Sequence, residues 1–224
     1  MPLLMLKTTV FLSSLAPLLW YLYAAWSDNL GANPIEAATR GLGTWALNFL
    51  LITLAVTPLI KLSGWRWPIH LRRMLGLFCY FYAVLHLTSY LWLDKFFFWD
   101  EIWQDILKRP YITVGMLALV LLTPLAATSN NFSIRRLGGP MWAKLHRLVY
   151  LIAILALTHY FLLVKFDITT PLAYAAVLTA LLGIRLYWRQ RRLRRVRGAA
   201  NGEARSPLKV LSIPLRLIPG LARR

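Results

Sequence analysis

Two histidines, His86 and His159, each lie inside an apolar stretch long enough to cross a membrane. His86 follows Arg73 by 13 residues and His159 follows Arg147 by 12. A helical rise of about 1.5 Å per residue therefore places the two roughly 20 and 18 Å along their segments. An ionisable side chain at such depth is costly and usually has a partner or a ligand.

Imidazoles at matched depth predict one shared metal, and haem iron is the natural metal between two membrane helices. Ligation by both His86 and His159 would fill the two axial positions of the iron and favour electron transfer over oxygen chemistry. The alternative is a pair of unrelated buried histidines, each hydrogen-bonded to a neighbouring helix.

His146 lies 13 residues before His159 on the same predicted segment, or roughly 20 Å along a helix axis. This spacing would suit stacked haems at two depths, and we interpret His146 as a further ligand or cofactor contact. Because 13 residues leave the two side chains about 140° apart, a shared haem-facing surface needs a bend or an irregular start before Arg147. His70, just before the arginines at 72 and 73, is a weaker candidate and is more typical of a solvated interfacial histidine.

Arg72, Arg73, Lys144 and Arg147 lie at the same ends of the two histidine segments. Guanidinium groups offer forked donors to anions, so this group is a candidate site for haem propionates, a flavin phosphate or a lipid phosphate. The alternative is the ordinary excess of cations in cytoplasmic loops.

Six apolar segments must position these side chains, and each is close to the ~20 residues that cross a hydrocarbon core as a helix. Hydrophobic residues make up 58% of the 224 residues and charged residues only 15%, which is typical of a membrane protein. The net charge of +18 is carried by loops and one tail, so nucleic acid is a poor partner. The single cysteine, Cys79, excludes an intrachain disulfide and is interpreted as packing. The segments span residues 8–26, 42–60, 74–93, 112–128, 147–164 and 171–188.

Loop charges predict the orientation, because lysine and arginine in short loops favour the cytoplasmic side. The loops after the second and fourth segments and the tail after Trp188 are strongly basic, whereas the other loops are weakly acidic or neutral. We therefore predict an all-α six-helix bundle over residues 1–188 with both termini cytoplasmic. Residues 189–224 are predicted to form a basic cytoplasmic tail that is flexible, with a joint near Gly198 and Gly202, or associated with the membrane surface. Loops and tail leave no room for a catalytic domain, so we expect an electron-transfer subunit and not a complete catalyst.

Four short motifs give the chain a family resemblance. They are RRMLGL at 72–77, LHLTSY at 85–90, RPYITVG at 109–115, and LHRLVY at 145–150 followed by His159 and Tyr160. Together they resemble the MsrQ family, the haem-binding membrane subunits of the bacterial periplasmic methionine-sulfoxide reductase system. The resemblance covers roughly residues 8–188 and implies a ferric-reductase-like transmembrane domain related to the membrane part of NADPH oxidases.

The resemblance implies haem b, with His86, His146 and His159 as the haem-associated histidines, and FMN, for which Arg72, Arg73 and Arg147 are our candidate contacts. It also implies a multi-pass protein of the bacterial inner membrane. Electrons would pass from the quinone pool to MsrP, a periplasmic molybdenum-cofactor enzyme that reduces methionine sulfoxide in oxidised proteins. The larger oxidase relatives have a second histidine on the third core helix, whereas this chain has an arginine near that depth.

Two other functions fit the sequence less well. A stand-alone reductase of ferric chelates or other small acceptors would use the same scaffold without a protein partner. A haem-free transporter or structural membrane subunit belongs to another class, but the sequence shows no clear internal repeat and no intramembrane carboxylate. The acidic loop around Asp94, Asp100, Glu101 and Asp105 is either a docking surface for the periplasmic partner or a solvated loop.

Overall fold

The computed structural model describes residues 3–164 and 166–205, with side chains described up to residue 197. Within these residues, six helical stretches are long and apolar enough to cross a membrane, and they confirm the six predicted spans. Many of their large apolar side chains are exposed, as expected for surfaces that face lipid. The stretches are Leu3–Trp26, Pro34–Ser63, Arg72–Asp94, Pro110–Ala127, Gly139–Leu163 and Thr169–Arg197.

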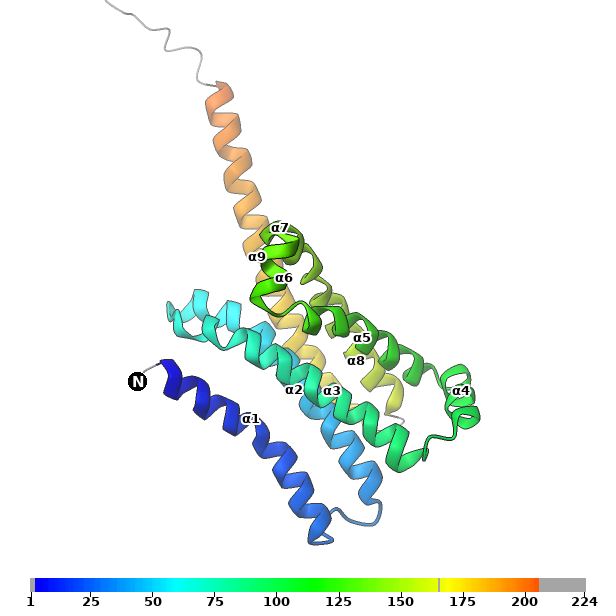
Figure 1. The fold of residues 1–224 in the computed structure, drawn as a ribbon. Helices are drawn as coiled ribbons and strands as arrows, with labels where there is room; N and C mark the ends of the chain where they lie inside the picture. Colours follow the sequence, from blue (N-terminus) through cyan, green and yellow to red (C-terminus); the bar gives the residue numbers. More distant parts are fainter. Residues whose placement is uncertain (1–2, 165, 206–224) are drawn as a thin grey trace, which may run out of the picture. The chain divides into compact units, whose positions relative to one another are not determined.

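Two helical pairs form the centre of the fold. Helix α2 (Pro34–Ser63) packs along α3 (Arg72–Ser89), and α5 (Pro110–Ala127) packs along α8 (Leu148–Leu163), as Figure 1 shows. The chain reverses between the partners of each pair and again between α3 and α5, so α3 and α8 run in the same direction (Figure 1). We call the end where α3 and α8 begin the basic end, and the end where they finish the acidic end.

Local sequence signals set the limits of α2. The Asn33 side chain accepts a hydrogen bond from the backbone N–H of Glu36, and Pro34 occupies the first helical turn, where its missing N–H costs nothing. The helix ends at Gly64, whose φ of 76° is in the left-handed region that glycine adopts without strain. The long apolar run between these signals becomes a 30-residue helix.

Helix α1 (Leu3–Trp26) is joined to α3 by a buried tyrosine. The Tyr82 hydroxyl donates to Ser14 O at 2.7 Å and accepts from the backbone N–H of Leu18 at 3.2 Å. Ser14 O and Leu18 N are the two groups that an ordinary helical hydrogen bond would join. The Tyr82 hydroxyl is therefore inserted between them, in place of one backbone hydrogen bond of α1. Tyr82 is fully buried and stacks on Phe49 of α2, which ties three helices together.

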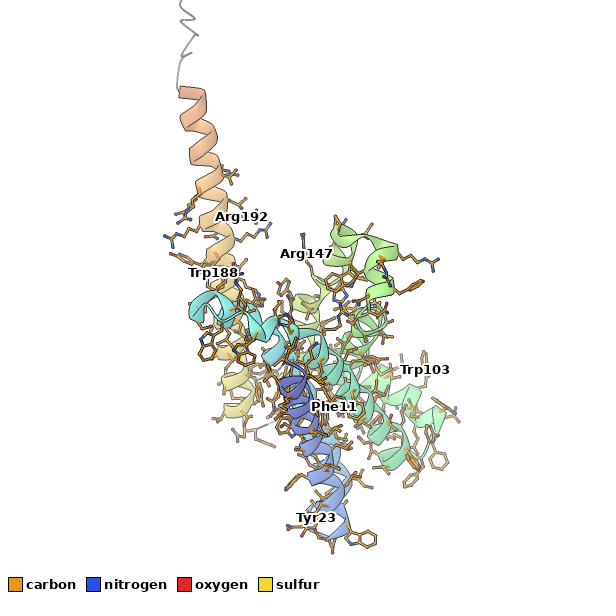
Figure 2. All side chains as sticks on the ribbon, turned by 60° about the vertical axis from the view of Figure 1, so that its left-hand side comes forward. Phe11, Tyr23, Trp103, Arg147, Trp188 and Arg192 are labelled. Atoms are coloured by element: carbon orange, nitrogen blue, oxygen red, sulfur yellow. The ribbon has the colours of Figure 1, made fainter. Side chains whose placement is uncertain are left out.

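The connections at the two ends differ in structure. At the basic end, a short 3₁₀ turn η1 (Trp67–His70) joins α2 to α3, and α6 (Asn131–Leu137) and α7 (Gly139–Leu145) join α5 to α8. At the acidic end, α3 continues into one wider π-type turn η2 (Tyr90–Asp94), which is followed by α4 (Trp99–Lys108). Phe96 and Phe97 reverse the chain before α4 with left-handed φ values of 45° and 59°. Trp103 of α4 points away from the helical core, and Arg147 lies at the other end (Figure 2).

The last helix, α9 (Thr169–Arg205), begins in the unit formed by residues up to Leu182 and continues into a second unit. The helix continues through Gly198 and Gly202, where we predicted a flexible joint. Arginine side chains surround it beyond Trp188, among them Arg192 (Figure 2). The rest of the predicted tail, residues 206–224, lies outside the described residues, and its association with the membrane stays a prediction.

Candidate functional site

His86 lies near the end of α3 and is held by α2. Its Nδ1 is 2.8 Å from the backbone oxygen of Thr39. Because a carbonyl oxygen only accepts, Nδ1 carries the proton in this contact and Nε2 keeps a free lone pair. The ring also packs against Gly43, where an added Cβ would be 3.0 Å from Nδ1. Gly43 therefore gives the ring access to the carbonyl one turn earlier.

His159 of α8 has the same surroundings on α5. Its Nδ1 is 2.6 Å from the backbone oxygen of Tyr111, and a Cβ at Gly115 would be 2.8 Å from that nitrogen. In both helical pairs the accepting carbonyl precedes the glycine by four residues, which places both on one face of the supporting helix. This repeated arrangement was missed from the sequence, where Gly43 and Gly115 were its only visible signal.

The structure brings the two imidazoles together, with ring centres 6.1 Å apart and planes inclined at 74°. Metal–nitrogen bonds of about 2.0 Å, plus about 1.1 Å from each nitrogen to its ring centre, give a separation of about 6.2 Å for two imidazoles on one metal. Each ring is hydrogen-bonded to a neighbouring helix, as the alternative prediction expected. The separation of His86 and His159 also matches a shared metal.

Two histidines alone are a small ligand set for a protein metal site. Among the described residues, no group of three or more His, Cys, Asp or Glu side chains could hold a metal ion. A structural or catalytic zinc site requires at least three protein ligands. Haem, whose macrocycle supplies the other four nitrogens, is the metal group that needs only two axial side chains.

A cavity of about 510 Å³ surrounds the two histidines, a size typical of cofactor pockets. Its lining is mainly apolar on the side of Leu50, Cys79 and Leu122, whereas Arg40 and Arg109 line it at the acidic end. The Thr39 hydroxyl oxygen is buried, and no hydrogen-bond partner is present for it among the described residues. An unpaired buried polar atom beside a cavity is a natural contact for a bound molecule.

His146 lies elsewhere, at the break between α7 and α8, which is the irregular start before Arg147 that its helical phase required. Its Nε2 is 3.1 Å from the Thr128 hydroxyl, and its ring stacks on Trp142 with centres 3.9 Å apart. Thr128 also donates to Pro124 O at 2.6 Å, so its single proton is used there and Nε2 of His146 is the donor. His146 is not among the lining residues of the cavity, and its role as a ligand stays a prediction.

The predicted basic group also lies at the basic end. Arg72 and Arg73 are close enough to His146 to interact with it electrostatically, and Arg73 donates to the Asn131 side chain at 2.8 Å. Arg147 is exposed. None of these arginines lines the histidine cavity. His70 is exposed, and its Nδ1 is 3.2 Å from Trp67 O within its own turn.

At the acidic end, Asp105 of α4 is buried within a polar cluster. It is 2.9 Å from the Lys95 ammonium and 3.1 Å from Arg109 Nε, and it accepts from the Tyr90 hydroxyl at 3.1 Å. Burial raises the pKa of Asp105, but these donors and charges outweigh it and hold the pKa below its usual value. Asp105 is only 8% exposed, so it attaches α4 to the bundle and is not available to a partner. The interpretation of the acidic loop as a docking surface therefore does not apply to this residue.

These features define a multi-pass helical membrane protein with a paired-histidine site between two helical hairpins. Residues 42–157 match the family described as ferric reductase like transmembrane component. Similar proteins named protein-methionine-sulfoxide reductase heme-binding subunit MsrQ include those of three bacteria. The protein of Azospira oryzae is 55% identical over 83% of this chain and 80% of its own length. The protein of Rhodospirillum rubrum is 54% identical over 84% of this chain and 90% of its own length. The protein of Polaromonas naphthalenivorans is 50% identical over 88% of this chain and 91% of its own length. The chain therefore belongs to the MsrQ family, as the motifs predicted.

Proposed function

We propose that this chain is a membrane electron-transfer subunit that passes electrons from the quinone pool, through haem b and FMN, to a periplasmic methionine-sulfoxide reductase. The observation that carries the proposal is the pair of imidazoles, His86 and His159, with centres 6.1 Å apart and both Nδ1 atoms bonded to backbone carbonyls. The family's relatives bear the name of haem-binding subunits, which supports the same cofactor.

In this proposal His86 and His159 would hold haem b, which would supply one-electron chemistry when it is bound. The carbonyls of Thr39 and Tyr111 fix the tautomer and the orientation of the rings, since the donated Nδ1–H leaves Nε2 for the metal. If both histidines hold the haem, the site would favour electron transfer over the binding of small molecules. The lining near Leu50 and Leu122 is apolar and offers water few hydrogen-bond partners.

The basic end is the proposed entry for electrons. Arg72 and Arg73 provide positive charge next to His146, whose ring stacks on Trp142. Aromatic surfaces beside cations suit a planar redox molecule with an anionic group, and FMN meets both requirements. Arg147 lies at the break between α7 and α8, next to His146, and is the third arginine proposed to contact FMN.

Orientation follows from the loop charges. Cytoplasmic placement of the basic end and of both termini in a bacterial inner membrane leaves the histidine pair in the outer half. The acidic end then faces the periplasm, where the partner would be MsrP, a molybdenum-cofactor enzyme that repairs oxidised proteins. The exposed carboxylates of Asp94, Asp100 and Glu101 remain for docking.

The test is a visible spectrum of the purified full chain, with haem and flavin quantified per chain. We expect a low-spin b-type spectrum that is lost when either His86→Ala or His159→Ala is introduced. Electron delivery from a quinol analogue to purified MsrP should be lost in the same variants. A normal haem spectrum in both histidine variants would refute the ligand assignment, and absence of haem from the wild-type protein would favour a transporter or structural subunit.

A stand-alone reductase of ferric chelates is the second candidate, because the matching family is described as ferric reductase like. It predicts reduction of a ferric chelate at a rate independent of MsrP. Our proposal predicts fast delivery of electrons only when the protein partner is present.

A further inference from the structure

The cavity around the histidines has a polar end that the ligand set does not use. Arg40 and Arg109 are the only lysine or arginine side chains among the described residues that line this cavity. One comes from each helical hairpin, since Arg40 is in the second turn of α2 and Arg109 immediately precedes α5. The cavity therefore has a pair of cations at the acidic end.

Both arginines are placed by the same elements that hold the imidazoles. Arg40 follows Thr39, and it precedes Gly43 by three residues, so it lies on the histidine-facing side of α2, one turn nearer the acidic end. Arg109 precedes Tyr111 by two residues and Gly115 by six, a rise of about 9 Å. The two cations therefore lie beyond the rings in the same direction.

Both guanidinium groups keep donors for a ligand. Arg40 pairs with Glu36, and both side chains of this pair are about half exposed. Arg109 uses Nε for Asp105 and one terminal nitrogen for the Tyr111 hydroxyl at 3.2 Å. A guanidinium has five N–H donors, so both arginines can also bind a carboxylate. Asp94 and Glu36 line the same end and are the competing anions.

We infer that Arg40 and Arg109 bind the two propionate carboxylates of the haem, which fixes its acidic edge toward the acidic end of the bundle. This rests on the proposed haem at His86 and His159. It assigns the propionates to these two residues, and leaves the group of Arg72, Arg73 and Arg147 to the second cofactor. Charge-assisted, forked hydrogen bonds of this kind are among the strongest that arginine makes.

The experiment uses the full chain in detergent and measures haem affinity and the midpoint potential of the iron. Arg40→Gln and Arg109→Gln should each weaken haem binding about tenfold or more, as expected for a lost hydrogen bond to a charged group. Both should lower the midpoint potential, because loss of a nearby positive charge stabilises the ferric form. Arg109→Lys, which keeps the charge, should retain most of the potential.

Matched controls separate this role from a structural one. Lys108→Gln removes a neighbouring exposed cation that does not line the cavity, and it should leave both quantities unchanged. Asp105→Asn breaks the ion pair of Arg109 but removes a negative charge, so it should raise the potential where Arg109→Gln lowers it. Haem dimethyl ester, which lacks propionate charge, should bind the wild type and Arg109→Gln with equal affinity.

Wild-type affinity and potential in both glutamine variants would overturn the inference. So would an Asp105→Asn effect of the same sign as Arg109→Gln, or a loss of affinity in Arg109→Gln that is as large for the ester as for haem. Absence of haem from the wild-type protein is a different result, because it would refute the proposed function itself.

Discussion

Replacing Gly115 with alanine places a methyl group against the ring of His159. The new Cβ would be 2.8 Å from Nδ1 and 3.0 Å from Cε1, whereas ordinary contacts begin near 3.4 Å. The ring or the helix must therefore move by about 0.6 Å. At Gly43 the corresponding distances to His86 are 3.0 and 3.1 Å, so the required movement is smaller.

The expected cost falls on the hydrogen bond between His159 and Tyr111. The ring cannot keep its 2.6 Å contact with the carbonyl unless α5 and α8 separate. Loss of such a partner of a ligating histidine typically weakens metal binding 10- to 100-fold, so haem affinity of Gly115→Ala should fall by about this factor. Gly43→Ala should show a smaller loss. The potential of the remaining haem should rise, since an imidazole without its Nδ1–H acceptor is a weaker donor to ferric iron.

The assay is haem per chain and reduction potential of the purified variants, with thermal melting as a check on folding. Gly76→Ala is the matched control, because it also lies in a membrane helix and a Cβ there would meet only Thr53 at 3.8 Å. Alanine is favoured over glycine in a helix by about 1 kcal/mol, so helix propensity alone predicts no loss in any of the three variants. If Gly115→Ala binds haem with the affinity and potential of Gly76→Ala, the proposed role of the glycine is wrong.

Three further predictions concern the surroundings of the site. Tyr82→Phe removes the hydroxyl that is hydrogen-bonded to the α1 backbone, and it should lower the free energy of unfolding by about 1–3 kcal/mol. Thermal or denaturant unfolding measures this change. Unchanged stability would show that α1 replaces the lost bonds with its own backbone hydrogen bond. Asp105 has a lowered pKa, so its contribution to holding α4 should be complete above about pH 4 and lost as the pH falls further. Limited proteolysis at α4 above and below pH 4 tests this, and equal cleavage of the wild type at both pH values would contradict it. Thr128→Val removes the partner of His146 and should reduce flavin per chain while haem is unchanged; haem loss with intact flavin would reverse the assignment of the two ends.

The basic and apolar pattern along the chain determined much of the architecture. Helix length and hydropathy are properties of contiguous residues, so the six spans were predictable from sequence, and motifs such as those around His86 and His146 identified the family. Depth along a helix is also additive, since each residue adds about 1.5 Å. The matched depth of His86 and His159 could therefore be predicted without knowing how the helices pack.

Lateral position and burial depended on tertiary structure, because they require the contacts between helices that are distant in sequence. Only the packing of α2 on α3 and of α5 on α8 showed that Gly43 and Gly115 open carbonyls to the imidazoles. Only the three-dimensional structure showed that Asp105 is buried and holds α4 to the bundle through its ion pair with Lys95.

The sequence by itself thus determined a membrane bundle with two imidazoles at one depth. Only the tertiary structure decided that the rings of His86 and His159 are 6.1 Å apart and that His146 is outside their cavity. It also placed Arg40 and Arg109, and not the more conspicuous arginines at 72 and 73, at the cavity. The physical reason is that charge patterns report the side of the membrane, whereas a binding cavity is made by side chains that meet from several helices.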